Sequence, residues 1–213
     1  MTGAARRGSQ KWLQRFVAEV PDALRPAGLP ALVWVSPIAE TRYREYSDGA
    51  FLDALGLSRL KPDLTAFWPR GGAVWDGLAV ASGTPVLVEA KAHVAEFFSS
   101  PCAAEAEASR NRIAASLEAC KQALGADDRS DWSRCFYQYA NRLAHLWWLH
   151  QHGIAAHLLF VNFVGDDDMK GPDTPAAWRA VERAADYALG LSTRHPLSAH
   201  VHHVHPDIRA LAS

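Results

Sequence analysis

The stretch from Val74 to His93 decides the fold, and it reads VWDGLAVASGTPVLVEAKAH. Its two apolar segments, 74–81 and 86–90, are separated by a Gly- and Pro-containing break at 82–85. Apolar, β-branched runs around such a break predict a β-hairpin. Because both faces of both strands are largely apolar, we expect central strands that are covered on both sides.

Three charged residues, Asp76, Glu89 and Lys91, interrupt these apolar strands. Burying a charge is costly unless it is paired or binds a metal ion. A two-residue or a four-residue loop brings all three charges to one face, whereas a three-residue loop turns Asp76 away. Pro85 favours the four-residue loop, because proline cannot donate to a β-ladder. In that register Asp76 lies opposite Lys91.

Two carboxylates on one face offer hard oxygen ligands, which suit Mg²⁺ or Mn²⁺. A neighbouring lysine can orient or deprotonate a water molecule, or stabilise developing negative charge. The alternative interpretation is a buried ion pair between Lys91 and one of the two acids.

The pattern of an Asp, twelve residues and then Glu-Ala-Lys resembles the signature of the PD-(D/E)XK nuclease superfamily, with Trp75 in place of its proline. The resemblance implies an α/β fold, a three-layer restriction-endonuclease-like core with a mixed central sheet flanked by helices. It also implies that Asp76, Glu89 and the backbone carbonyl of Ala90 bind Mg²⁺ or Mn²⁺. Lys91 would assist the water that attacks phosphorus.

In the resembled superfamily, a helix before the hairpin often carries a further Glu toward the metal. The segment 38–57 predicts one helix or two abutting helices, and within it we choose Glu45, with Glu40 and Asp48 as second choices. The alternative is that Glu45 is a solvated helix charge or pairs with a neighbouring arginine.

A helix after the hairpin often places a Gln, Lys or Arg beside the active site in that superfamily. We expect helices over 101–124, ending at Gly125, and from Cys135 to His150. On the second of these we choose Gln138 ahead of Arg142 as the active-site neighbour. The alternative for Gln138 and Arg142 is a structural role, in which they form hydrogen bonds between the helix and the sheet.

The remaining apolar patterns predict two more helices and another central strand, which together give a mixed sheet flanked by helices. Helical spacing occurs at 10–20 and at 174–189, the latter with Thr174 as its expected N-cap. The apolar run 155–164 has the length of a strand and is expected beside the hairpin. Segment 60–75 predicts an irregular loop that folds its aromatic side chains onto the core.

Four histidines lie within the six residues from His200 to His205. Strand alternation puts His200 and His202 on one face and His203 and His205 on the other, so a single zinc site cannot easily take all four. We interpret this segment as an edge strand, with adventitious nickel or zinc binding as the alternative.

The composition is that of one globular domain over residues 1–213, with residues 1–10 disordered. Of its residues 49% are hydrophobic, and the formal net charge of −1 argues against strong nonspecific DNA binding. Three widely spaced cysteines predict reduced thiols in a cytoplasmic protein. No apolar run approaches the length of a transmembrane helix, so we expect no membrane association.

These observations lead to the expectation of a metal-dependent nuclease, a hydrolase that cleaves phosphodiester bonds in nucleic acid, with DNA as the expected substrate. A homodimer would supply the two hydrolytic centres that a double-strand cut requires. The alternative is a catalytically silent or partner-dependent nuclease-fold module that binds within a defence or repair complex.

Overall fold

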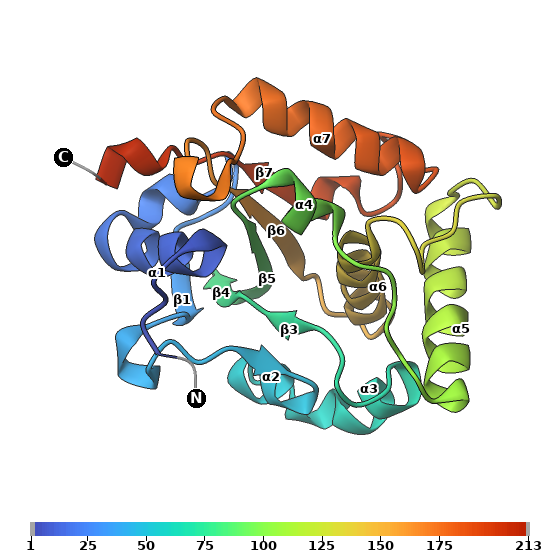
Figure 1. Ribbon diagram of the computed structural model, residues 1–213. Coiled ribbons are helices and arrows are strands. Elements are labelled where there is room, and N and C mark those ends of the chain that lie inside the picture. Colours follow the sequence, from blue (N-terminus) through green and yellow to red (C-terminus); the bar gives the residue numbers. More distant parts are fainter. Residues whose placement is uncertain (1–2, 212–213) are drawn as a thin grey trace.

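The computed structural model describes residues 3–211, in which a five-stranded mixed sheet is flanked by helices (Figure 1). The strands of this sheet, in spatial order, are β1 (Leu32–Ser36), β4 (Gly77–Ala81), β5 (Thr84–Lys91), β6 (His157–Asn162) and β7 (Val201–Val204). β1, β4 and β5 pair antiparallel, whereas β5, β6 and β7 pair parallel. The predicted α/β class with a mixed sheet is therefore confirmed.

Helices supply both outer layers and the crossovers that parallel strands require. They are α1 (Gly8–Glu19), α2 (Gly49–Ala54), α3 (Lys61–Phe67), α4 (Val94–Phe98), α5 (Glu107–Leu124), α6 (Tyr137–Gln151) and α7 (Pro175–Ala188). α4, α5 and α6 lie between β5 and β6 in the chain, and α7 lies between β6 and β7. None of the helices within residues 3–211 has the length and apolar character needed to cross a bilayer.

The hairpin of β4 and β5 has a tighter turn than we predicted. Ala81 pairs with Thr84, so the connection is the two-residue turn Ser82-Gly83, not the four-residue loop 82–85. Both turn residues have positive φ, 47° and 86°, as a type I′ turn requires. Pro85 is tolerated because its nitrogen faces the β6 side of β5, one residue before the first pair of that ladder.

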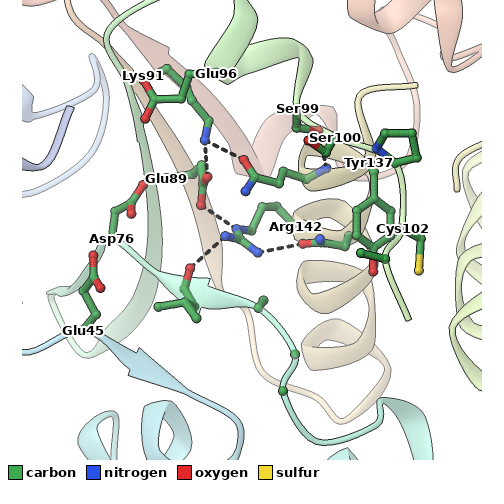
Figure 2. Close-up of a pocket in the computed structure, with 18 of the residues that line it drawn as sticks. Glu45, Asp76, Glu89, Lys91, Glu96, Ser99, Ser100, Cys102, Tyr137 and Arg142 are labelled. Carbon is green, nitrogen blue, oxygen red and sulfur yellow. Dashed lines mark hydrogen bonds and ion pairs between the residues drawn. The ribbon is translucent and has the colours of Figure 1, made fainter. Parts of the chain in front are cut away.

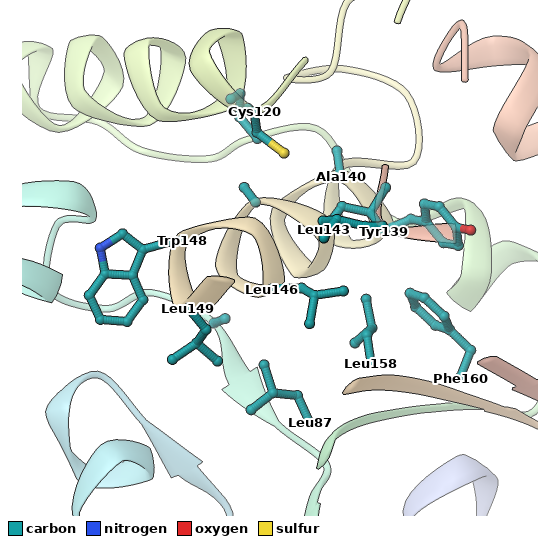
Figure 3. Close-up of a cluster of buried hydrophobic side chains, with 14 of the residues drawn as sticks. Leu87, Cys120, Tyr139, Ala140, Leu143, Leu146, Trp148, Leu149, Leu158 and Phe160 are labelled. Atoms are coloured by element: carbon teal, nitrogen blue, oxygen red, sulfur yellow. The ribbon is translucent and has the colours of Figure 1, made fainter. Parts of the chain in front are cut away.

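Each face of the sheet buries its own apolar layer. On one face, Leu87, Leu158 and Phe160 pack against α6, which is buried along most of its length (Figure 3). On the other face, Val86, Val88, Ala90, Leu159 and Val161 pack against Trp12, Leu13 and Phe16 of α1. This double covering explains why β5 and β6 read as nearly continuous apolar runs.

The predictions for β6 and α7 are confirmed. β6 lies beside β5 in parallel register, with Glu89 paired to Phe160. Thr174 caps α7 by accepting a hydrogen bond from the Ala177 amide at 3.2 Å. β7 forms the expected edge strand.

The helix predicted over 38–57 is wrong for its first half. Arg42 and Tyr43 both have positive φ, 55° and 56°, which no α-helix accommodates. The chain instead forms β2 (Tyr46–Ser47), which pairs with β3 (Val74–Trp75) in a second, two-stranded sheet. Before α2 this segment has only the single 3₁₀ turn Ala39–Thr41, and α-helix begins only at α2.

Three other boundaries also differ from prediction. Segment 60–75 contains the short helix α3 and is not wholly irregular, although Trp68 folds onto the core as expected. Residues 101–106 form no regular secondary structure, so α5 starts only at Glu107. α6 starts at Tyr137, because Phe136 has a φ of 50°.

The N-terminal segment is more ordered than we predicted. α1 begins at Gly8, and Ser9 is buried, so residues 8–10 belong to the folded domain. Residues 1 and 2 lie outside the described range. The three cysteines, Cys102, Cys120 and Cys135, are free thiols, as expected.

Short 3₁₀ helices complete the chain. They span Pro21–Leu24, Ala39–Thr41, Ser58–Leu60, Asp167–Met169, Ser198–His200 and Ile208–Leu211.

Candidate active site

A cleft of about 1230 Å³ opens where β4 begins and β5 ends. The N-terminal turn of α1, the segments 68–74 and 99–105, and the first turns of α6 line it. Asp76, Glu89 and Lys91 all line the cleft, so the structure brings together the three charges of the hairpin (Figure 2). Glu45 and Gln138, chosen on the resemblance alone, line the same cleft.

Asp76 occupies the junction between β3 and β4, at the point where the hairpin ladder ends. The last ladder pair joins Gly77 to Val88, so Asp76 comes next to Glu89 rather than opposite Lys91. Its Oδ2 accepts a hydrogen bond from the Ala90 amide at 2.8 Å. The glycine that follows it leaves room for β1, because a Cβ at Gly77 would lie 3.0 Å from the Ser36 carbonyl oxygen and would require a local shift.

Glu89 is held between two cations. Its side chain is 2% exposed, Lys91 Nζ donates to Oε1 at 2.6 Å, and Arg142 Nε donates to Oε2 at 2.6 Å. Lys91 Nζ also donates to Gln138 Oε1 at 2.7 Å. Gln138 therefore fixes the ammonium group from α6, which is the position that we predicted for it.

Arg142 is bound on every side of its guanidinium group. Besides Glu89, it donates to the Val74 carbonyl and to Asn141 Oδ1, each at 2.7 Å. The guanidinium carbon also lies 4.7 Å from the centre of the Trp75 ring. Arg142 thus ties α6 to β3 and to the acidic cluster, a stronger role than our second-place choice assigned to it.

Burial and neighbouring charges set the protonation of the cluster. Burial, reinforced by the charge of Glu89, raises the pKa of Asp76 to about 8. Burial alone would raise the pKa of Glu89 as well, but the charges of Arg142 and Lys91 outweigh it and lower that pKa. For Lys91, burial would lower the pKa, but the carboxylates of Glu89 and Asp76 raise it above its usual value. Of the two acids of the hairpin, burial therefore favours the protonated form of Asp76, whereas the two cations keep Glu89 ionised.

Glu45 reaches the cleft from an extended segment just before β2, not from the helix that we predicted. Its carboxylate accepts a hydrogen bond from Gln10 of α1. Burial, with a smaller contribution from the charge of Glu89, raises its pKa. The two second choices, Glu40 and Asp48, do not line the cleft. Glu40 is exposed. Asp48 accepts hydrogen bonds from the amides of Gly71 and Gly72.

Glu96 is a cleft residue that sequence reasoning missed. Its Oε2 accepts from the Ala92 amide at 2.8 Å, and its Oε1 accepts from Ser9 Oγ at 2.6 Å. Its negative charge also contributes to the raised pKa of Lys91. The partner Ser9 is 87 residues away, so no local spacing signals this contact.

The cleft floor carries carboxylate and carbonyl oxygens, the kind of ligand that a hard divalent cation prefers, although both oxygens of Glu89 are ion-paired. Asp76 uses only Oδ2 for the Ala90 amide, and the Ala90 carbonyl faces the same side of β5 as that amide. Residues 3–211 contain no group of three His, Cys, Asp or Glu side chains placed to hold a metal ion. A cation here would thus rely on Asp76, Glu89, Ala90 and water, which is the coordination that Mg²⁺ commonly adopts.

The C-terminal histidines do not line this cleft. His203 and His205 contact Glu182 Oε1 at 3.2 Å and 2.7 Å on one face of the sheet. His202 Nε2 lies 3.0 Å from His157 Nδ1 on the other face. The predicted division is therefore confirmed for His202 against His203 and His205. His200 lies outside β7, in the 3₁₀ helix Ser198–His200, and its ring packs against His150 and His157.

No protein-family model, curated protein or solved structure matches the chain. Membership of the PD-(D/E)XK superfamily therefore stays a proposal that rests on the residues and geometry of the cleft.

Proposed function

We propose that the chain is a metal-dependent nuclease that hydrolyses phosphodiester bonds, with DNA as its substrate. The observation that carries this proposal is the convergence of Asp76, Glu89 and Lys91 at the floor of an open cleft. A carboxyl group with a pKa of about 8, such as Asp76, beside an accessible cavity is more common in catalytic sites than in structural ion pairs.

Each of these side chains would have a separate role in such a site. Asp76 Oδ1, Glu89 and the Ala90 carbonyl would hold Mg²⁺ or Mn²⁺. The bound ion would supply charge stabilisation to the phosphoryl group and a water of lowered pKa. Lys91 would orient the attacking water or stabilise charge on the phosphoryl oxygens, while Gln138 and Arg142 hold Lys91 and Glu89 in position.

The sheet supports the more specific assignment to a restriction-endonuclease-like core. Its antiparallel β1–β4–β5 part continues into parallel β6, and the acids lie on the hairpin, as the resemblance implies. The three free thiols support a cytoplasmic location. A homodimer and a protein partner remain predictions.

Cleavage assays with matched variants test the proposal. With Mn²⁺ or Mg²⁺ and a mixture of DNA substrates, we expect wild-type cleavage to fall at least about a hundredfold in Glu89→Gln and Lys91→Met. Asp22→Asn and Lys61→Met, which change exposed charges outside the cleft, should cleave at the wild-type rate. Full metal-dependent cleavage by Glu89→Gln would end the assignment.

The partner-dependent binding module is retained as a second candidate because both oxygens of Glu89 are already engaged by cations. In that case the isolated chain would bind Mn²⁺ in calorimetry, lose binding in Asp76→Ala, and cleave nothing. Metal binding together with cleavage by the isolated chain would exclude this candidate.

A further inference from the structure

The cleft extends beyond the acidic cluster along a wall that carries almost no charge. This wall, which we call the neutral wall, consists of Ser99, Ser100, Pro101, Cys102, Tyr137 and Asn141. Its residues come from the extended segment after α4 and from the first turns of α6 (Figure 2). It therefore adjoins Gln138 and, through it, Lys91.

The charges of the cleft are too few and too balanced for a duplex. Its basic side chains are Arg7, Arg70, Lys91 and Arg142, and its acidic side chains are Glu45, Asp76, Glu89, Glu96 and Glu105. Lys91 and Arg142 are buried and paired with Glu89, which leaves Arg7 and Arg70 for backbone phosphates. Proteins that hold duplex DNA commonly neutralise about 6–10 phosphates, several times more than two arginines can.

Tyr137 offers the neutral wall a ring for stacking. Among residues 3–211, no aromatic ring packs against Tyr137, whereas its neighbour Tyr139 is stacked on Phe160 at a centroid distance of 4.6 Å. The Tyr137 side chain is half-buried: it packs in part against the main apolar core and also lines the cleft. Burial and the Cys102 thiol raise its pKa, so the phenol stays neutral.

The polar groups around this ring are neutral donors and acceptors. Gln138 uses its amide oxygen for Lys91, so its NH₂ group remains a donor in the cleft lining. Asn141 is buried, accepts from Arg142 through its amide oxygen and also interacts with the Tyr137 side chain. Ser100 adds a hydroxyl on an exposed part of the wall. Such groups can hydrogen-bond to the edge of a nucleobase or to a sugar without any charge.

We propose that the neutral wall is a nucleoside subsite, where a base of single-stranded DNA stacks on Tyr137 beside the phosphate that lies over Asp76, Glu89 and Lys91. The substrate is thus a single strand or a frayed end, not an intact duplex. This inference rests on the proposed nuclease function for the position of the phosphate. The stacking itself requires only the cleft.

Fluorescence anisotropy with a labelled single-stranded 12-mer and its matched duplex tests the subsite. The titrations use the full chain with EDTA, so that no strand is cut. We expect the single strand to bind at least about tenfold more tightly than the duplex, because stacking needs an unpaired base. Tyr137→Ala should weaken single-strand binding about tenfold, and Tyr137→Phe should retain it.

Two further variants keep the test decisive. Tyr187→Ala removes a tyrosine that is 89% exposed and lies outside the cleft, and should bind like wild type. Ser100→Trp fills the subsite from an exposed, extended segment, so it should weaken binding even if Tyr137→Ala fails to fold. Equal loss of affinity in Tyr187→Ala and Tyr137→Ala would overturn the inference.

Cleavage of the same two substrates with Mn²⁺ separates this inference from the proposed function. Duplex cleavage as fast as single-strand cleavage would overturn the subsite and leave the nuclease standing. Tight, Tyr137-dependent binding of the single strand without cleavage would support the subsite and remove the nuclease. Failure to bind the single strand would overturn the subsite directly.

Discussion

The proton on Asp76 makes metal affinity depend on pH within a narrow range. With a pKa of about 8, Asp76 must release this proton before it can serve as an anionic ligand through Oδ1. The ionised fraction is about one half at pH 8, about one tenth at pH 7 and about one hundredth at pH 6. The apparent Kd for Mn²⁺ should therefore rise about fifty-fold between pH 8 and pH 6.

Isothermal titration calorimetry measures both the affinity and the proton. Repeating each titration in two buffers of different ionisation enthalpy gives the number of protons released per ion, which should approach one at pH 6 to 7. Asp22→Asn, an exposed carboxylate outside the cleft, should keep the same pH dependence. A wild-type affinity that is constant from pH 6 to pH 8, with no proton release, would refute the reasoning.

Two further predictions concern stability. Asp76→Asn should stabilise the fold at pH 8 by up to about 5 kcal/mol, because the folded state holds a proton that the unfolded state releases near pH 4, so wild-type stability falls as pH rises through this interval. In urea denaturation this gain should vanish near pH 4, and a gain independent of pH would contradict it. Arg142→Met should destabilise the fold by about 3–5 kcal/mol, since it leaves Glu89 buried with one cation fewer. A loss below about 1 kcal/mol would show that Glu89 does not depend on Arg142.

Local sequence patterns predicted an element correctly where the residues of that element alone form the apolar face that it buries. The apolar runs around Ser82-Gly83 predicted the hairpin, and the period of two along β5 placed Glu89 and Lys91 on one face. The capping residue and helical period predicted α7 to its N-terminal residue. The loop length was mispredicted because Pro85 lies beyond the end of the β6 ladder, where its missing amide costs nothing.

Patterns failed where a distant partner decides the local conformation. The sequence of 38–47 has helical spacing, but β2 pairs with β3 instead. This pairing satisfies backbone hydrogen-bonding groups that an isolated short helix would leave exposed. Glu45 still reached the cleft, although from an extended segment and with Gln10 as its partner. Glu45 therefore lines the cleft, but the segment before β2 presents it and not a helix.

The sequence by itself determined the class of fold and the three charges of the candidate site, because alternation along adjacent strands is a local property of the chain. Only the tertiary structure decided the state of those charges. Arg142 reaches Glu89 across 53 residues, and Glu96 reaches Ser9 across 87. Burial and Coulomb interactions act through space and not along the chain, so the protonated Asp76 and the neutral wall emerge only when the helices pack against the sheet.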